Sequence, residues 1–251
     1  MENTKAVLLV GGLGTRLRSV VPSAPKPMAS VGDRPFLELL VRQLQSQGIR
    51  RLVMCTGYLA EQIEQEFGDG HGLNVEIEYS KEPAPLGTAG ALKLARPCLQ
   101  GTSDFLVLNG DSFLEVDFER LGRFHRQHGG LVTMAVVPVP NAQRYGTVRV
   151  ARGSRVEGFS EKTGSSAPGL VNAGVYLFRT SVFDHIPDGP ASLEKDVFPA
   201  ILGEGVFALE QDGMFIDIGT PEDYARAQAI RARLCDAAVQ KQPARVSETD
   251  E

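Results

Sequence analysis

The stretch that decides the fold is GGLGTRL at residues 11–17, which directly follows the continuous apolar run AVLLV at residues 6–10. An unbroken apolar run suits a central parallel strand that is buried on both faces of a sheet. Glycines directly after such a strand let backbone N–H groups approach phosphates, and the guanidinium of Arg16 fits phosphate oxygens. The stretch therefore predicts a phosphate-binding loop at the carboxyl end of the first strand. A tight strand-to-helix turn that binds no ligand is the alternative.

This glycine loop lacks the features of two common nucleotide-binding motifs. Leu17 occupies the place of the third glycine in a dinucleotide fingerprint, and no Gly-Lys-Ser or Gly-Lys-Thr sequence follows. The sequence therefore has neither a dehydrogenase fingerprint nor a P-loop.

The first 115 residues alternate short apolar runs with amphipathic segments, which is typical of strands joined by crossover helices. Ligands bind outside the carboxyl ends of the strands in such sheets, so the loops after Val10, Tyr79 and Leu108 should converge on one crevice. The pattern predicts strands at 6–10, 52–55, 75–79 and 105–108, and helices at 35–47 and 60–67.

The second half of the chain has a different sequence pattern, in which apolar segments typical of strands are interrupted by Gly, Pro and Asn. The pattern predicts strands at 131–137, 147–150, 156–159 and 171–178, and a closing helix at 221–234. We expect one α/β domain over residues 1–235, with a mixed, mostly parallel sheet flanked by helices and a β-rich half from about residue 116. Residues 236–251 have few large apolar side chains and are expected to form a flexible tail.

Composition excludes several classes of protein. The 251 residues carry 26 Lys and Arg against 31 Asp and Glu, a net charge of −5, which is the wrong sign for holding a nucleic acid by general electrostatics. No apolar stretch approaches the roughly 18 residues that a membrane span requires. Three widely spaced cysteines, Cys55, Cys98 and Cys235, indicate reduced thiols and a cytoplasmic location.

Three charged residues are candidates for phosphate and metal chemistry. Lys26 lies between Pro25 and Pro27, which fix the backbone around it, although a surface loop would also explain this pattern. Asp111 and Asp217 each follow an apolar run, and two such carboxylates suit Mg²⁺ together with substrate phosphates. Capping of loops at strand ends is the alternative for each aspartate.

The histidines do not form a recognisable catalytic arrangement. His125 and His128 are three residues apart on a polar helix with no third ligand nearby, and we expect both to face solvent. No Ser/His/Asp or Cys/His constellation is apparent, which argues against covalent catalysis.

Taken together, these segments resemble the sugar-1-phosphate nucleotidylyltransferases, also called nucleotide-sugar pyrophosphorylases, over about residues 5–234. Within that family, RLRSVV (16–21) with PKPMA (25–29), YSKE (79–82) and SLEKDVFP (192–199) look most like the D-glycero-α-D-manno-heptose 1-phosphate guanylyltransferases. The matching family blocks are GGLGTRL (11–17), PKPM (25–28), PLGTAG (85–90), NGD (109–111), EK (161–162), NAG (172–174) and DIGT (217–220).

The resemblance implies a Rossmann-like fold with a nucleotide-binding half and a sugar-binding half. The implied reaction transfers a nucleoside monophosphate from an NTP to a sugar 1-phosphate and releases pyrophosphate. By resemblance, Arg16 and Lys26 hold the triphosphate, Asp111 and Asp217 hold Mg²⁺, and Lys162 holds the sugar phosphate. The remaining residues implied are Gly11, Gly12, Gly14, Thr15, Glu82, Gly87 and Thr88 for the nucleotide, and Tyr145, Gly146, Glu161 and Asn172 for the sugar.

The residues also favour guanine as the base. Guanine offers two adjacent donors, N1–H and the exocyclic amine, and the carboxylate of Glu82 can accept from both. Glu82 follows the third strand and lies five residues before Gly87. The alternative is that Glu82 is a solvated residue beside Lys81 and that backbone atoms alone recognise the base.

The most specific prediction is therefore formation of GDP-heptose from GTP and D-glycero-α-D-manno-heptose 1-phosphate for a bacterial surface polysaccharide, capsule or lipopolysaccharide. Mannose 1-phosphate with GTP, or another sugar 1-phosphate with UTP or dTTP, is the nearest alternative. A non-catalytic nucleotide or sugar-phosphate sensor on the same fold is a more distant one. GTP and the sugar phosphate are the expected partners, with a homo-oligomer possible and no nucleic acid or membrane.

Overall fold

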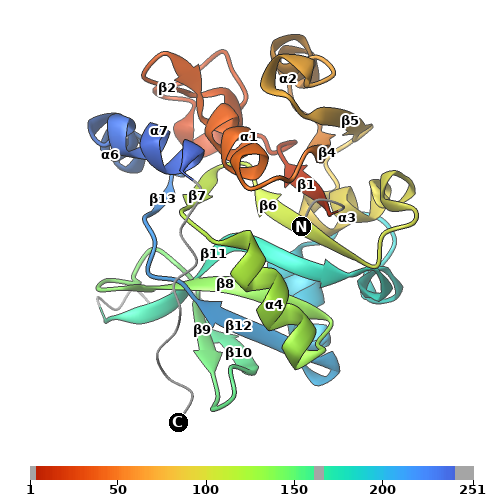
Figure 1. Cartoon of the computed structure of the whole chain (residues 1–251). Coiled ribbons are helices and arrows are strands. Elements are labelled where there is room, and N and C mark those ends of the chain that lie inside the picture. The colour runs from red at the N-terminus through yellow and green to blue at the C-terminus, as the bar shows by residue number, and fades with distance from the viewer. Residues whose placement is uncertain (1–3, 161–166, 241–251) are drawn as a thin grey trace.

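Four parallel strands form the N-terminal part of the central sheet, in the order β6, β1, β4, β5 (Figure 1). The structure is a computed structural model that describes residues 4–160 and 167–240. Alternate side chains of β1 point to opposite faces of the sheet, so Leu8 joins one buried apolar cluster and Val7 joins the other. The bounds are β1 (Lys5–Leu9), β4 (Arg51–Thr56), β5 (Glu76–Lys81) and β6 (Asp104–Asn109).

The second half of the chain extends this sheet with mainly antiparallel strands, which confirms the mixed sheet that the sequence predicts. The long strand β11 pairs with β6, β8 and β9, and its register shifts between Asn172 and Tyr176. Nine strands of the described residues belong to this sheet. The added strands are β8 (Val132–Val139), β9 (Thr147–Val150), β10 (Val156–Ser160), β11 (Gly169–Arg179) and β12 (Val206–Glu210).

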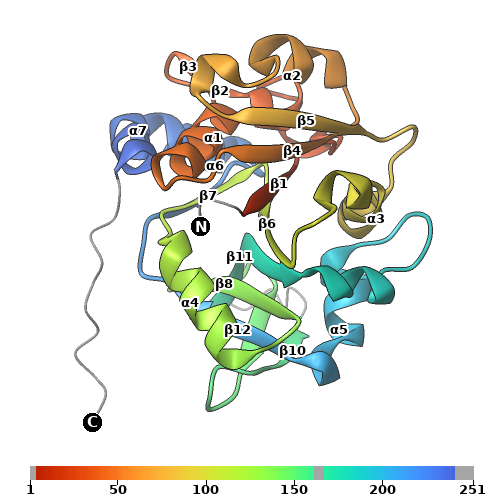
Figure 2. The same ribbon diagram turned by 45° about the vertical axis from the view of Figure 1, so that its right-hand side comes forward.

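Helices cover both faces of the sheet (Figures 1 and 2). Side chains of α1, α4 and α7 belong to the apolar cluster that contains Leu8, whereas α3 and α5 contribute to the cluster that contains Val7. The α-helices are α1 (Phe36–Ser46), α2 (Ala60–Phe67), α3 (Gly87–Leu94), α4 (Phe118–His128), α5 (Phe198–Ala200), α6 (Pro221–Ala229) and α7 (Arg231–Val239).

A short two-stranded sheet brings the C-terminal segment back to the first half of the molecule. The strands β7 (Ser112–Leu114) and β13 (Phe215–Asp217) are antiparallel, and Asp217 pairs with Ser112. The helix α7 then packs against α1, as the blue and orange ribbons show in Figure 2. The C-terminal segment thus lies against the first half of the chain. A second small sheet pairs β2 (Ser30–Val31) with β3 (Arg34–Pro35).

The prediction for the C-terminus also needs correction. The single helix expected at 221–234 is two helices, α6 and α7, which meet at Ile230. The helix α7 continues past the expected start of the tail at residue 236, because the small side chains of Ala237 and Ala238 are buried in the core. Residues 241–251 lie outside the described part of the chain.

The prediction that His125 faces solvent is wrong. Its side chain is buried beneath α4, where Nδ1 lies 2.8 Å from the hydroxyl of Thr133 and Nε2 lies 3.8 Å from a carboxylate oxygen of Asp104. Burial lowers the pKa of His125 to about 4, and the charges of Arg179 and Arg126 act in the same direction while Asp104 opposes them. The ring is therefore neutral in the folded protein near neutral pH.

We expect His125 to make the fold sensitive to acid. Its pKa is about 4 in the folded state and about 6.5 in the unfolded chain. The unfolded state therefore binds the proton first, and stability is lost as the pH falls from 6.5 to 4, by about 3 kcal/mol for this group. Urea unfolding of the wild type and His125→Gln at several pH values measures the difference. An identical pH dependence of the two unfolding free energies would contradict this assignment.

Candidate active site

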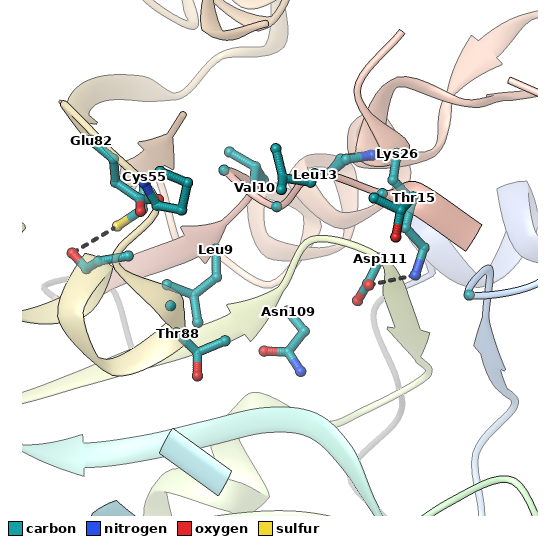
Figure 3. A pocket seen from close by; sticks show the side chains of 18 of the residues that line it. Leu9, Val10, Leu13, Thr15, Lys26, Cys55, Glu82, Thr88, Asn109 and Asp111 are labelled. Atoms are coloured by element: carbon teal, nitrogen blue, oxygen red, sulfur yellow. Dashed lines mark hydrogen bonds and ion pairs between the residues drawn. The ribbon is translucent and has the colours of Figure 1, made fainter. Parts of the chain in front are cut away.

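A cavity of about 360 Å³ lies where the carboxyl ends of the parallel strands meet (Figure 3). The loops after β1, β5 and β6 all contribute to its wall, which confirms that they converge as the sequence predicts. The sequence-predicted residues that line it are Gly11, Gly12, Gly14, Thr15, Arg16, Lys26, Glu82, Gly87, Thr88 and Asp111.

The glycine loop is shaped by a left-handed residue and by close contact with Lys26. Gly14 has φ +58°, and a Cβ atom there would lie 2.8 Å from the Cβ atom of Lys26. The carbonyl of Gly14 accepts a hydrogen bond from Leu17 at 3.0 Å, which starts the 3-10 turn Thr15–Leu17. This turn buries Leu17 in the core and leaves Arg16 exposed at the cavity. A glycine at position 14 is therefore required both by conformation and by space.

Lys26 holds two carboxylates that are far apart in the sequence. Its side chain is only 9% exposed, and Nζ lies 2.6 Å from Asp111 Oδ2 and 3.7 Å from Asp217 Oδ1. Asp111 follows β6, and the pairing of β13 with β7 places Asp217 beside it. The side chains of both aspartates remain partly exposed. One ammonium and two carboxylates therefore form a cluster, of which Lys26 and Asp111 line the cavity and Asp217 does not.

The two carboxylates suit a hard cation. Burial raises the pKa of Asp217, and the neighbouring charge of Asp111 raises it further, while Lys26 and the N–H of Gly219 act in the opposite direction. A cation placed between the two aspartates would relieve this repulsion. The described residues contain no group of three or more His, Cys, Asp and Glu side chains that could hold a metal. Two carboxylates completed by substrate phosphates fit the coordination that Mg²⁺ commonly takes.

Glu82 lies at the opposite end of the cavity from Asp111 (Figure 3). It is half-buried, its Oε2 accepts a hydrogen bond from the N–H of Leu86 at 2.8 Å, and its Oε1 lies against Gly11. Burial raises the pKa of Glu82, and the hydrogen bond from Leu86 opposes that shift. Lys81 instead pairs with Glu61 at 2.7 Å, so Glu82 is not the solvated partner of Lys81.

Thr88 has a structural role in addition to its place on the cavity wall. Its hydroxyl donates to Glu194 at 2.9 Å and accepts from the N–H of Leu193 at 2.8 Å. These bonds fix α3 to the π-helical turn Leu193–Val197. Gly87 begins α3 with φ +70°. The turn that carries Gly87 and Thr88, which are predicted to bind the nucleotide, is therefore joined to the second half of the molecule.

The structure brings the predicted sugar-binding residues together less completely. Tyr145 lines a second cavity, of about 580 Å³, beside Phe215. Gly146 directly precedes β9, and the side chain of Asn172 donates to the hydroxyl of Tyr176 at 2.8 Å. Glu161 and Lys162 lie outside the described residues. The sugar side of the site is thus described only in part.

Several residues of the first cavity have no role in the sequence-based prediction, and Asn109, Leu13 and Cys55 are notable among them. Asn109 immediately precedes the Gly110-Asp111 pair and could have been found as a polar residue that closes an apolar strand. Leu13 is 46% exposed within the glycine loop, where an apolar side chain suits a base or a sugar face. The thiol of Cys55 is buried at the end of β4, and burial together with Glu82 raises its pKa. All three cysteines are free, as predicted.

Comparison with known proteins places this chain in a family. The nucleotidyl transferase family model matches residues 5–233. Mannose-1-phosphate guanylyltransferase from Mycobacterium tuberculosis is 39% identical over 232 residues, which is 91% of this chain and 64% of that protein. Mannose-1-phosphate guanylyltransferase catalytic subunit beta from Drosophila pseudoobscura pseudoobscura is 38% identical over 232 residues, covering 91% and 62%. The chain thus spans less than two thirds of the length of these relatives.

Solved structures agree with the sequence comparison. HddC from Yersinia pseudotuberculosis, solved in complex with GMP-PN, superposes with a TM-score of 0.81 at 32% identity, covering 90% of this chain and 98% of HddC. No helix of the described residues is both long enough and apolar enough to cross a membrane. The family model, the relatives and the arrangement of the glycine loop with its lysine and aspartates agree, and this chain belongs to the nucleotidyl transferase family.

Proposed function

We propose that this protein transfers GMP from GTP to a sugar 1-phosphate, releasing pyrophosphate and forming a GDP-sugar. The observation that carries the proposal is that Lys26, which lines the cavity of the glycine loop together with Asp111, contacts both Asp111 and Asp217. The names of the relatives from Mycobacterium tuberculosis and Drosophila support a guanine nucleotide and a sugar 1-phosphate. The complex of HddC with GMP-PN supports a guanine nucleotide as well.

The proposed chemistry needs no general base from the protein. A sugar phosphate has its second pKa near 6, so its oxygen is already anionic near neutral pH. That oxygen attacks the α-phosphorus of GTP, a new P–O bond forms, and the bond from the α-phosphorus to the bridging oxygen breaks. The electron pair leaves with pyrophosphate. The protein must therefore align two anions and stabilise the charge on the leaving group.

The residues at and beside the cavity would have different roles, which follow from their positions. The N–H groups of the glycine loop and the exposed guanidinium of Arg16 would bind the β- and γ-phosphates. Lys26 would hold its ammonium against the same phosphates while keeping Asp111 and Asp217 together. Mg²⁺, held by these two aspartates, would neutralise phosphate charge when bound. Lys162 remains the proposed contact for the sugar phosphate.

The sugar is proposed to have the manno configuration. The named relatives favour mannose 1-phosphate, whereas the blocks at 16–29, 79–82 and 192–199 resemble enzymes for a manno-heptose 1-phosphate. These two sugars share the manno ring and differ in the carbon added beyond the hexose. The proposal is tested by mass spectrometry of the GDP-sugar formed over time from GTP and one sugar phosphate. The sugar phosphates compared are mannose 1-phosphate, manno-heptose 1-phosphate and glucose 1-phosphate. A faster reaction with glucose 1-phosphate than with both manno sugars would contradict it.

We expect Glu82→Gln to weaken the preference for GTP over UTP. Glutamine keeps an oxygen that can accept from Leu86, so the loop is preserved, but it loses the second acceptor that guanine would use. The ratio of kcat/KM for GTP to that for UTP should fall by about tenfold, as for a charged hydrogen bond. Glu61→Gln is the matched control, because Glu61 is exposed and pairs with Lys81 outside the cavity. An unchanged ratio in Glu82→Gln would rule out Glu82 as the residue that recognises the base.

A further inference from the structure

The segment 18–24 joins Arg16 to Lys26, the two side chains proposed to bind the triphosphate, and it lies at the surface. Leu17 before it and Pro25 after it are buried, whereas every residue of the segment itself is half-buried or exposed. A surface segment with few buried side chains opens easily. Its conformation therefore depends on contacts with other parts of the chain.

The loop after β4 and the first turn of α2 supply such contacts. The guanidinium of Arg18 lies over the ring of Tyr58, 5.0 Å from its centroid. The Nε2 atom of Gln62 donates a hydrogen bond to the carbonyl of Ser23 at 3.0 Å. The N–H of Tyr58 also donates to the carbonyl of Gly11, at the start of the glycine loop, at 3.3 Å. One element thus holds both ends of the surface segment and the glycine loop before it.

The backbone that presents these two side chains is strained. Leu59 has φ +53°, a left-handed conformation that leucine rarely adopts. A residue in such a conformation persists where the surrounding structure over-determines it, often near functional sites. The turn at Leu59 lets α2 begin at Ala60, directly after Tyr58. Tyr58 and Gln62 can therefore both contact the segment 18–24.

We propose that Tyr58 and Gln62 are positioning residues, which hold the segment 18–24 and thereby keep the glycine loop and Arg16 in the arrangement that binds the triphosphate of GTP. The inference rests on the proposed function. Tyr58, Gln62 and Arg18 do not line the first cavity, so they would act through the loop rather than by touching GTP. A loop that is open part of the time binds its ligand more weakly, in proportion to the fraction that is correctly arranged.

Steady-state kinetics separate the binding of GTP from the other steps. Tyr58→Leu combined with Gln62→Leu should raise the KM for GTP by about five- to tenfold, as for a cation–π contact and a hydrogen bond lost together. The kcat at saturating GTP and the KM for the sugar 1-phosphate should stay within about twofold of wild type, because bound GTP restores the loop. Tyr58→Phe keeps the ring and should keep the wild-type KM for GTP.

Hydrogen exchange measured without ligand tests the support of the loop directly. The N–H groups of Val20 and Val21 donate to the carbonyl of Leu17 at 3.0 and 2.9 Å, so their exchange rates report the opening of this turn. Tyr58→Leu and Arg18→Leu should each speed this exchange by about two- to fivefold, and saturating GTP should remove the difference. Arg18 is exposed, so Arg18→Leu keeps the test decisive even if Tyr58→Leu does not fold.

Arg96→Leu is the matched control for Arg18→Leu. Arg96 is also exposed and also lies over an aromatic ring, that of Phe183, at 5.4 Å from the centroid. It belongs to the 3-10 turn Arg96–Leu99 and does not line the first cavity. Its replacement should change neither the KM for GTP nor the exchange of Val20 and Val21.

The outcomes distinguish this inference from the function on which it rests. Unchanged exchange of Val20 and Val21 in both Tyr58→Leu and Arg18→Leu would overturn the inference. A higher KM for GTP in Arg18→Leu with unchanged exchange would instead assign Arg18 a direct contact with the nucleotide, and would overturn it as well. A wild type that forms no GDP-sugar would overturn the proposed function and the role in GTP binding with it, even if exchange shows that Tyr58 supports the loop.

Discussion

Asp111→Asn and Asp217→Asn are each expected to lose at least about a hundredfold in turnover while the protein stays folded. The two side chains meet at one ammonium although they are far apart in the sequence, and asparagine keeps their size while removing the charge. A hard cation binds carboxylate oxygens far better than amide oxygens. Turnover is measured by pyrophosphate release over a titration of MgCl₂, with thermal unfolding to verify the fold.

Asp188→Asn serves as the matched control for both substitutions. Asp188 is 98% exposed and forms its ion pair with Lys93 rather than with a residue of the cavity, so its replacement should leave turnover and the Mg²⁺ requirement unchanged. Full activity of the wild type in excess EDTA would remove the two-carboxylate metal site from the mechanism. Wild-type turnover in both aspartate variants would do the same.

Lys26→Ala is expected to slow both GDP-sugar synthesis and the reverse reaction, pyrophosphorolysis, by about a hundredfold or more. The same ammonium meets the same phosphates in either direction. Its removal also leaves Asp111 and Asp217 facing each other without the cation that now lies between them. Initial rates in both directions, measured with saturating Mg²⁺, test this expectation.

Lys5→Ala is the matched control for Lys26→Ala. Lys5 is also largely buried and pairs with a carboxylate, that of Glu78 at 2.9 Å, but it lies at the amino end of β1, away from the cavity. Its replacement should leave both rates unchanged. If Lys26→Ala altered only the KM for the sugar phosphate, the assignment of Lys26 to the triphosphate would be wrong.

The parts of the fold that the sequence predicts well are those with a strong local pattern. The helix α1 lies inside the predicted range 35–47 because its apolar residues repeat at helical spacing and Gly48 follows it. The end of α7 was missed because Ala237 and Ala238 are small, and only their burial against other elements shows that they belong to the core. The burial of His125 likewise depends on contacts from distant segments, such as Thr133 of β8.

In the candidate site, too, features that follow from local sequence patterns are predictable, whereas those that depend on contacts between distant segments are not. That Gly14 and Asp111 share a cavity could be predicted, because both follow parallel strands of one sheet. That Asp217 lies beside Asp111 depends on the pairing of β13 with β7, two strands of three residues each. Strands this short carry no recognisable periodicity, so the sequence suggests a shared Mg²⁺ site for the two aspartates but does not predict the strand pairing that brings them together. The contacts of Tyr58 and Gln62 with the segment 18–24 are likewise visible only in the packed structure.

The most direct test of the proposed function is a pyrophosphate-release assay that crosses GTP, ATP, CTP, UTP and dTTP with the 1-phosphates of mannose, manno-heptose and glucose. The account predicts that GTP with a manno-configured sugar 1-phosphate gives the highest kcat/KM of all combinations, and that release requires the sugar phosphate. A highest kcat/KM with UTP or dTTP, or no sugar-dependent release of pyrophosphate from any combination, would contradict it.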